Sequence, residues 1–149
     1  MSSPIFKQAS KTDKDAWIRL RETLYDGVES TFHEEEIEII LNDKTKATFL
    51  VFETGKEDSI GMLELSLRNI VDGCLSSPVG YIEGIYLHEK VRGKGYGRQM
   101  IDFAKKWAKS QGCSELGCDA ELDDLSAQMF HQKMGFRETY RIVQYKMDI

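Results

Sequence analysis

The chain has 149 residues, 41% hydrophobic and 30% charged, a composition typical of one globular domain over residues 1–149. Its formal net charge of −5 disfavours a nucleic-acid surface, and no apolar stretch is long enough to cross a bilayer. Three cysteines without a Cys-x-x-Cys pair argue against a disulfide framework and a zinc site, and they favour the reducing cytoplasm.

The first half of the chain has the periodicity of a strand, two helices and a hairpin. The strand covers residues 5–9, and the first helix follows a capping box at residues 12–15. A second helix begins near Ser30 or Thr31. Strands at residues 48–53 and 60–68 complete this half, joined around a glycine.

The second half continues with alternating strands and helices. A strand at residues 81–87 is interrupted by Gly84, which indicates a bulge. A helix follows a glycine-rich run, then a short strand at 115–119 and a last helix at 123–134. From Phe136 onward, alternation at Val143, Tyr145 and Met147 predicts closing strands. This order predicts an α/β fold with one mixed sheet and helices on its faces.

The glycine-rich run at residues 91–97 is the most informative motif. Glycines at 93, 95 and 97 let the backbone turn tightly before a helix, so that successive N–H groups converge on an anion. Arg92 and Lys94 add positive charge. The spacing fits neither the P-loop nor the Rossmann fingerprint. The sequence therefore indicates a phosphate cradle, and the alternative is a surface turn that binds nothing.

The pattern Arg92-x-x-Gly95-x-Gly97, after a strand that ends at Ile85-Tyr86-Leu87, resembles the acetyl-CoA signature of the GCN5-related N-acetyltransferase (GNAT) superfamily. This resemblance implies a mixed, mostly antiparallel sheet with helices on both faces. It also implies a splayed central strand pair, between which CoA lies. The co-substrate is then acetyl-CoA, and no metal is needed.

The resemblance also assigns residues to the co-substrate. Backbone N–H groups near Ile85 and Leu87 are expected to bind the acetyl-pantetheine arm. Asp124 stands where the family often has an asparagine that contacts the cofactor. The pyrophosphate is expected to lie against the cradle residues Arg92, Gly93, Lys94, Gly95, Tyr96, Gly97 and Arg98.

His131 is a candidate for the leaving-group step. Many relatives carry a tyrosine four residues before the Gly-Phe pair, where it protonates the departing thiolate, and this chain has His131 before Gly135-Phe136. A histidine suits proton transfer near neutral pH. The alternative is a surface histidine without a catalytic role.

Three acidic residues are candidates for binding the acceptor. Glu83 lies inside an apolar strand, where a carboxylate is costly unless it faces a cavity or a cation. Asp119 ends the next strand, and Glu138 follows the last helix. Each is alternatively an ordinary exposed acid.

A second, narrower resemblance gives these acids a role. The block Cys74-x-Ser76-Ser77-Pro78 before Glu83 is similar to the aminoglycoside 6'-N-acetyltransferases. In those enzymes carboxylates bind the ammonium groups of the antibiotic, and Glu83 and Asp119 carry that pattern here.

The resemblance implies a polycationic small-molecule amine as acceptor and a homodimer, without nucleic acid or membrane as partner. Tyr25 stands at the rim of the substrate site, where the family tends to have tryptophan. Glu83 or Asp119 is the candidate base, unless the small neutral fraction of the amine reacts unaided. Two other functions remain open: a polyamine or small-amine acetyltransferase, and a non-catalytic acetyl-CoA-binding module.

Overall fold

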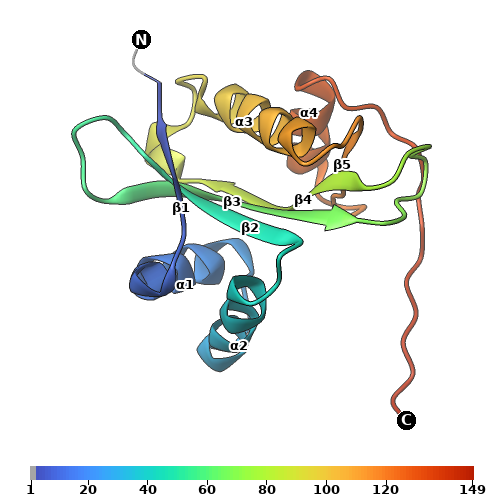
Figure 1. The fold of residues 1–149 in the computed structure, drawn as a ribbon, viewed down its shortest axis with the longest axis horizontal. Coiled ribbons are helices and arrows are strands. Elements are labelled where there is room, and N and C mark those ends of the chain that lie inside the picture. Colours follow the sequence, from blue (N-terminus) through green and yellow to red (C-terminus); the bar gives the residue numbers. More distant parts are fainter. Residues whose placement is uncertain (1–2) are drawn as a thin grey trace.

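In the computed structural model, which describes residues 3–149, one five-stranded sheet has helices on both faces (Figure 1). Residues 1 and 2 of the predicted domain lie outside the described part. The strands lie in the order β1 (Ile5–Gln8), β2 (Lys46–Phe52), β3 (Ser59–Arg68), β4 (Val79–Leu87) and β5 (Leu116–Cys118). Each pair of neighbouring strands from β1 to β4 is antiparallel, and β5 is parallel to β4. The predicted mixed, mostly antiparallel sheet is therefore confirmed.

The helices divide between the two faces of the sheet. Helices α1 (Lys14–Leu24) and α2 (Ser30–Leu41) cover one face, and α3 (Tyr96–Ser110) and α4 (Leu125–Lys133) lie over the other (Figure 1). Short 3-10 turns, η1 (Lys11–Asp13) and η2 (Glu89–Val91), precede α1 and follow β4. No helix within residues 3–149 combines the length and apolarity that a bilayer crossing requires.

Strand β3 is buried on both sides because it runs between the two layers of helices. Leu63 and Leu65 pack in the same core cluster as Met100 of α3, whereas Met62 packs with Trp17 of α1. Successive side chains of β3 therefore point alternately to the face covered by α3 and to the face covered by α1. Glu64, between Leu63 and Leu65, points to the α1 side.

The capping box before α1 differs from the prediction. The backbone N–H of Ser10 donates to Asp13 at 2.9 Å, so the box is formed by Ser10 and Asp13 around η1 rather than by residues 12–15. The prediction was wrong because a 3-10 turn precedes the helix, so the capping box begins two residues earlier, at Ser10.

The predicted bulge is confirmed, and it determines where Glu83 lies. Glu64 pairs with Gly84 and Leu65 pairs with Ile82, so Glu83 is the extra residue of β4. Its side chain lies on the same side of the sheet as Ser66 and Arg68, which both contact it. The bulge therefore presents a carboxylate on the α1 side of the sheet.

Strands β4 and β5 pair only over residues 80–82 and 116–118. Within residues 3–149, no strand pairs with residues 83–87 of β4 on the β5 side. This gap corresponds to the splayed central pair that we expected.

The closing strands predicted from Phe136 onward are absent from residues 136–149. These residues form an extended tail that leaves the sheet (Figure 1). Val143, Tyr145 and Met147 are 74%, 90% and 85% exposed. The prediction was wrong because alternation shows only that a segment suits a strand, whereas a strand also needs a neighbour to accept its hydrogen bonds.

Candidate active site

The glycine-rich run forms a tight loop at the N-terminus of α3. Gly93 and Gly95 both have φ of +84°, a conformation that favours glycine. A Cβ atom added at either position meets no atom within 4 Å, so the space above the loop is open. The first N–H groups of α3 have no intrahelical acceptor and carry the positive end of the helix dipole. This geometry fits an anionic pyrophosphate.

The cationic side chains around the loop are tied to neighbouring groups. Arg92 donates from Nε to the Leu87 carbonyl at 2.9 Å. Lys94 lies 3.3 Å from the Glu53 carboxylate. Arg98 donates to the carbonyl of Lys133 at 3.3 Å. All three side chains remain exposed. They supply charge at the rim of the loop while the backbone supplies the donors.

Tyr96 and Gly97 contribute to the cradle through their backbone. The Tyr96 ring is buried, and its hydroxyl donates to Glu53 at 2.9 Å, the carboxylate that also pairs with Lys94. A Cβ atom at Gly97 would lie 2.9 Å from the ring of Phe130 in α4. A side chain at Gly97 would displace the Phe130 ring, so Gly97 favours the close approach of α3 and α4, a packing role that the loop motif did not reveal.

The free side of β4 begins immediately after the bulge. Ile85 and Leu87 lie in the stretch that has no partner on the β5 side. Backbone groups on this side are available to an extended ligand, in the way that a peptide adds to a sheet edge. Their placement agrees with the role expected for the acetyl-pantetheine arm.

Glu83 forms a two-pronged ion pair with Arg68. The guanidinium donates from Nη2 to Oε1 at 2.7 Å and from Nε to Oε2 at 2.9 Å, and Ser66 also bonds Oε2. Half-burial by itself raises the pKa of Glu83, but Arg68 and Ser66 outweigh it and hold this pKa below its usual value. Glu83 is thus a fixed negative charge and a weak base.

Asp119 lies at the end of β5 and is connected to the same cluster through Tyr81. The Tyr81 hydroxyl donates to Asp119 at 2.6 Å, and the Arg68 guanidinium lies 3.5 Å from the centre of the Tyr81 ring. Burial, and then the bond to Asp119, raises the pKa of Tyr81, so the hydroxyl stays protonated and donates. The predicted pair of acids is therefore linked through Arg68 and Tyr81.

Glu138 is not brought into this cluster. It is exposed in the tail, where it accepts from Nε of Arg141 at 2.6 Å. Within residues 3–149 no bond joins it to Glu83 or Asp119. Its predicted role in binding the acceptor finds no support in the position of this tail.

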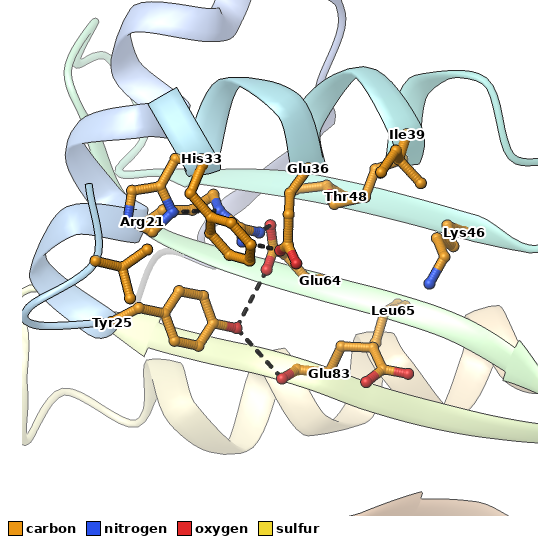
Figure 2. Close-up of a pocket in the computed structure, with 13 residues that line it drawn as sticks. Arg21, Tyr25, His33, Glu36, Ile39, Lys46, Thr48, Glu64, Leu65 and Glu83 are labelled. Atoms are coloured by element: carbon orange, nitrogen blue, oxygen red, sulfur yellow. Dashed lines mark hydrogen bonds and ion pairs between the residues drawn. The ribbon is translucent and has the colours of Figure 1, made fainter. Parts of the chain in front are cut away.

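Tyr25 lies at the end of α1, against the bulge of β4. Its hydroxyl donates to the carbonyl of Glu83 and to the Glu64 carboxylate, both at 3.3 Å (Figure 2). Tyr25 therefore joins the first helix to the strand that carries Glu83. This position at the edge of the acidic cluster agrees with the predicted rim.

A buried charged cluster that the residue spacing does not predict lies behind Tyr25. Arg21 donates to Glu64 at 2.6 Å, and the indole N–H of Trp17 donates to the same carboxylate at 2.9 Å. Arg21 is 3% exposed and Glu64 is 4% exposed. The available indication was the place of Arg21 in the apolar stripe of α1, four residues after Trp17.

His131 lies in α4 beside Phe130 and Phe136, close to Asp119. Burial lowers its pKa, and Asp119 and Asp124 only partly oppose that shift. The ring is therefore mostly neutral at pH 7. Its Nδ1 atom is buried without a hydrogen-bond partner among the described residues.

Asp124 has a structural function at the start of α4. Its carboxylate accepts the backbone N–H of Ala127 at 3.0 Å and caps the helix. This bond occupies one oxygen of the group that was predicted to contact the cofactor. Within residues 3–149, no group of three or more metal-ligating side chains is present.

Comparison with known proteins agrees with this geometry. The model of the acetyltransferase (GNAT) family matches residues 14–136. The aminoglycoside N(6')-acetyltransferase type 1 of Stenotrophomonas maltophilia is 35% identical over 99% of this chain and 95% of its own length. The enzyme of the same name from Serratia marcescens is 37% identical over 89% of this chain and 90% of its own length.

Solved structures agree over the whole fold. AAC(6')-Iy in complex with the bisubstrate analog CoA-S-monomethyl-acetylneamine superposes with a TM-score of 0.90 at 32% identity, covering 99% of this chain and all of that one. The apo AAC(6')-IG of Acinetobacter haemolyticus also gives 0.90, at 33% identity over 97% of this chain and 99% of that one. Together with the cradle and the open β4 edge, these matches establish that the chain belongs to the acetyltransferase (GNAT) family.

Proposed function

We propose that the protein transfers the acetyl group of acetyl-CoA to the 6'-amine of an aminoglycoside, and thereby confers antibiotic resistance. The observation that carries this proposal is the pair of acids, Glu83 and Asp119, held on either side of the β4–β5 opening and connected through Arg68 and Tyr81. Full-length relatives that bear the name of this activity support it.

Acetyl-CoA fits the loop and strand edge described above, and it supplies a thioester carbonyl that an amine can attack. Its pyrophosphate would lie against the backbone of residues 93–97, with Arg92, Lys94 and Arg98 at the rim. Its pantetheine arm would follow Ile85 and Leu87 along the open side of β4. Backbone donors at a helix N-terminus and a strand edge are preorganised, which is the property that charge stabilisation requires.

The acceptor is a polycation, and the two acids would bind its ammonium groups. Each well-placed carboxylate contributes about 1 to 4 kcal/mol before desolvation. Glu83 is charged at neutral pH, because Arg68 and Ser66 lower its pKa, so it acts as an anchor. Asp119, at the end of β5, is then the better placed base for the attacking amine, directly or through water. Tyr25 forms the adjoining rim.

His131 would assist the departing thiolate. Because its pKa is lowered, it acts at neutral pH by donating a hydrogen bond from its neutral ring rather than as an imidazolium. Burial and then Asp119 raise the pKa of the Cys118 thiol to about 12, which disfavours its thiolate form and so its use as a nucleophile. The raised pKa of this thiol favours direct transfer, from thioester to amine, over an intermediate acetylated at Cys118.

The experiment is thiol release from acetyl-CoA, compared for tobramycin, kanamycin and spermidine. The aminoglycosides should react with a much higher kcat/KM than spermidine. A preference for spermidine would favour the second candidate function, a polyamine acetyltransferase. Acetyl-CoA binding without thiol release for any amine would favour the non-catalytic module.

We also propose a homodimer, because the tail at residues 136–149 exposes a strand-like surface. Ile142, Val143, Tyr145 and Met147 are each more than half exposed, and the tail extends away from its own sheet (Figure 1). A second copy would accept the tail as an additional strand and bury these side chains. Removal of residues 140–149 should convert a dimer to a monomer in light scattering, and an unchanged mass would contradict the tail-mediated dimer.

The remaining proposals concern organisation and compartment. Residues 1–149 form one domain, since a single sheet holds every strand from residue 5 to residue 118. Cys74, Cys113 and Cys118 are all free thiols, which supports the reducing cytoplasm as the compartment.

A further inference from the structure

A cavity adjoins Glu83 on the α2 side of the sheet. It has a volume of about 350 Å³ and lies between α2 and strands β2, β3 and β4 (Figure 2). This volume is near the lower limit for small-molecule sites, so it suits one sugar-sized ring rather than a whole antibiotic. Glu83 lines this cavity and also belongs to the proposed acceptor site, so the two share that residue.

The charges that line this cavity largely neutralise one another. Arg21 forms ion pairs with both Glu64 and Glu36. Glu83 is paired with Arg68, which lies outside the lining, and Lys46 adds a further positive charge to the lining. A cavity with balanced charges has no strong preference for an ammonium group, and it favours hydroxyl groups, which both donate and accept.

Two buried polar atoms in the lining have no hydrogen-bond partner among the described residues. They are Nε2 of His33, a residue with 0% exposure, and Oγ1 of Thr48, a residue with 3% exposure. Buried polar atoms are nearly always bonded, because an unpaired one costs about 1 to 3 kcal/mol. Two of them in the wall of one cavity indicate a polar ligand.

The hydrogen bonding of His33 defines what that ligand must offer. Arg21 donates from Nε to Nδ1 of His33 at 3.1 Å, so Nδ1 carries the lone pair and Nε2 carries the proton. Nε2–H is therefore a donor that needs an acceptor oxygen. A hydroxyl oxygen satisfies it and an ammonium group does not, while Thr48 can donate to or accept from the same kind of group.

The rim of the cavity is apolar. Val28, Phe32 and Ile39 line it and are 37%, 47% and 60% exposed. An apolar rim over a polar floor matches a sugar ring, which presents C–H faces as well as hydroxyl groups at its edge.

We infer that this cavity binds a hydroxylated ring of the acceptor other than the ring that is acetylated, with His33 Nε2–H donating to a ring hydroxyl and Thr48 bonding to the same or a neighbouring hydroxyl. The inference rests on the proposed function, because it assigns a specificity site to the same acceptor. His33 and Thr48 thereby select multi-ring aminoglycosides over simple amines.

The test compares one acceptor with two rings, neamine, and one with a single ring, 6-amino-6-deoxyglucose. Thr48→Val removes the hydroxyl, and His33→Asn keeps an acceptor for Arg21 while removing the Nε2–H donor. In each variant kcat/KM for neamine should fall about tenfold, and for the single ring it should change less than twofold. Thr31→Val, an exposed position on α2 outside the cavity, is the matched control.

Thermal unfolding separates binding from folding. The Thr48 hydroxyl has no hydrogen-bond partner among the described residues. Thr48→Val should therefore keep or raise Tm while it weakens the binding of neamine. If His33→Asn fails to fold, the kcat/KM values of Thr48→Val for the two acceptors are sufficient to test the inference. Unchanged kcat/KM for neamine in folded Thr48→Val, or an equal loss for both acceptors, would overturn the inference.

Calorimetric titration with neamine distinguishes this inference from the proposed function. Wild-type protein that binds neamine but does not acetylate it contradicts the function alone, and the tenfold weaker binding by Thr48→Val still tests the cavity. Wild-type protein that does not bind neamine contradicts both.

Discussion

Tyr81 donates its hydroxyl proton to the Asp119 carboxylate over 2.6 Å, across the short parallel pair of β4 and β5. This bond fixes the orientation of Asp119 where β5 ends and the β4 edge becomes free. The other oxygen of Asp119 takes no hydrogen bond from residues 3–149. Asp119 is therefore held by one oxygen and open to an acceptor through the other.

Asp119→Asn should lower kcat/KM for tobramycin by one to several orders of magnitude, because it removes the charge that binds and deprotonates the amine. Each tenfold loss corresponds to about 1.4 kcal/mol of transition-state stabilisation. The affinity for acetyl-CoA, measured by calorimetry, should not change. Tyr81→Phe is the companion variant, and it should cost less, since it frees Asp119 without removing its charge.

Gly95→Ala should weaken the binding of acetyl-CoA at least tenfold, because the Cβ atom of the alanine would occupy the open space above the cradle. The substitution also strains a backbone with φ of +84°, which lowers stability by about 1 kcal/mol. Gly55→Ala is the matched control, because Gly55 has φ of +79° and open surroundings but lies in the β2–β3 turn. Equal cofactor affinity in the two variants would show that the loop is only a turn.

His131 should make the protein sensitive to mild acid. Burial lowers its folded pKa below the ordinary 6.5, so the unfolded chain binds the proton more tightly. The free energy of unfolding should therefore fall as pH falls from about 6.5 through the folded pKa. In His131→Gln this slope should be shallower, as measured by urea unfolding between pH 7 and pH 5. An identical slope would show that His131 titrates normally.

The same residue gives a kinetic prediction. His131→Ala should lower kcat more than it changes the binding of acetyl-CoA or tobramycin, because the thiolate loses a hydrogen-bond donor. Equal turnover in His131→Ala and wild type would show that His131 has no role in the mechanism and that water protonates the thiolate.

Arg68→Gln should release Glu83 from its ion pair. With the pair partly exposed, the stability cost should be about 1 kcal/mol. The pair contributes stability above the usual pKa of a glutamate, and this contribution is lost as pH falls through the lowered pKa of Glu83. The variant should therefore show less acid destabilisation below about pH 4.5 than wild type. A steeper acid limb in Arg68→Gln would contradict this account of the Glu83 charge.

The features predicted correctly from the sequence depend on local patterns. The tight turn of the glycine-rich loop and the helical spacing of α3 lie in one continuous segment, so turn chemistry and periodicity were sufficient to predict them. The bulge beside Gly84 was also indicated locally, because glycine interrupts an otherwise regular strand.

The features that the sequence did not reveal depend on distant partners. Arg68 and Glu83 are on different strands, and only the sheet register brings them together. The same holds for Arg21 and Glu64, and for the missing neighbour of the tail at residues 136–149. Charge pairing and strand pairing are set by topology, which residue spacing alone does not give.

The most direct measurement is the position of the acetyl group on the product formed from tobramycin and acetyl-CoA, determined by NMR. We expect a single acetyl group on the 6'-amine, formed by wild type and lost in parallel with activity in Asp119→Asn. Acetylation at another amine, or of a monoamine while no aminoglycoside reacts, would contradict it.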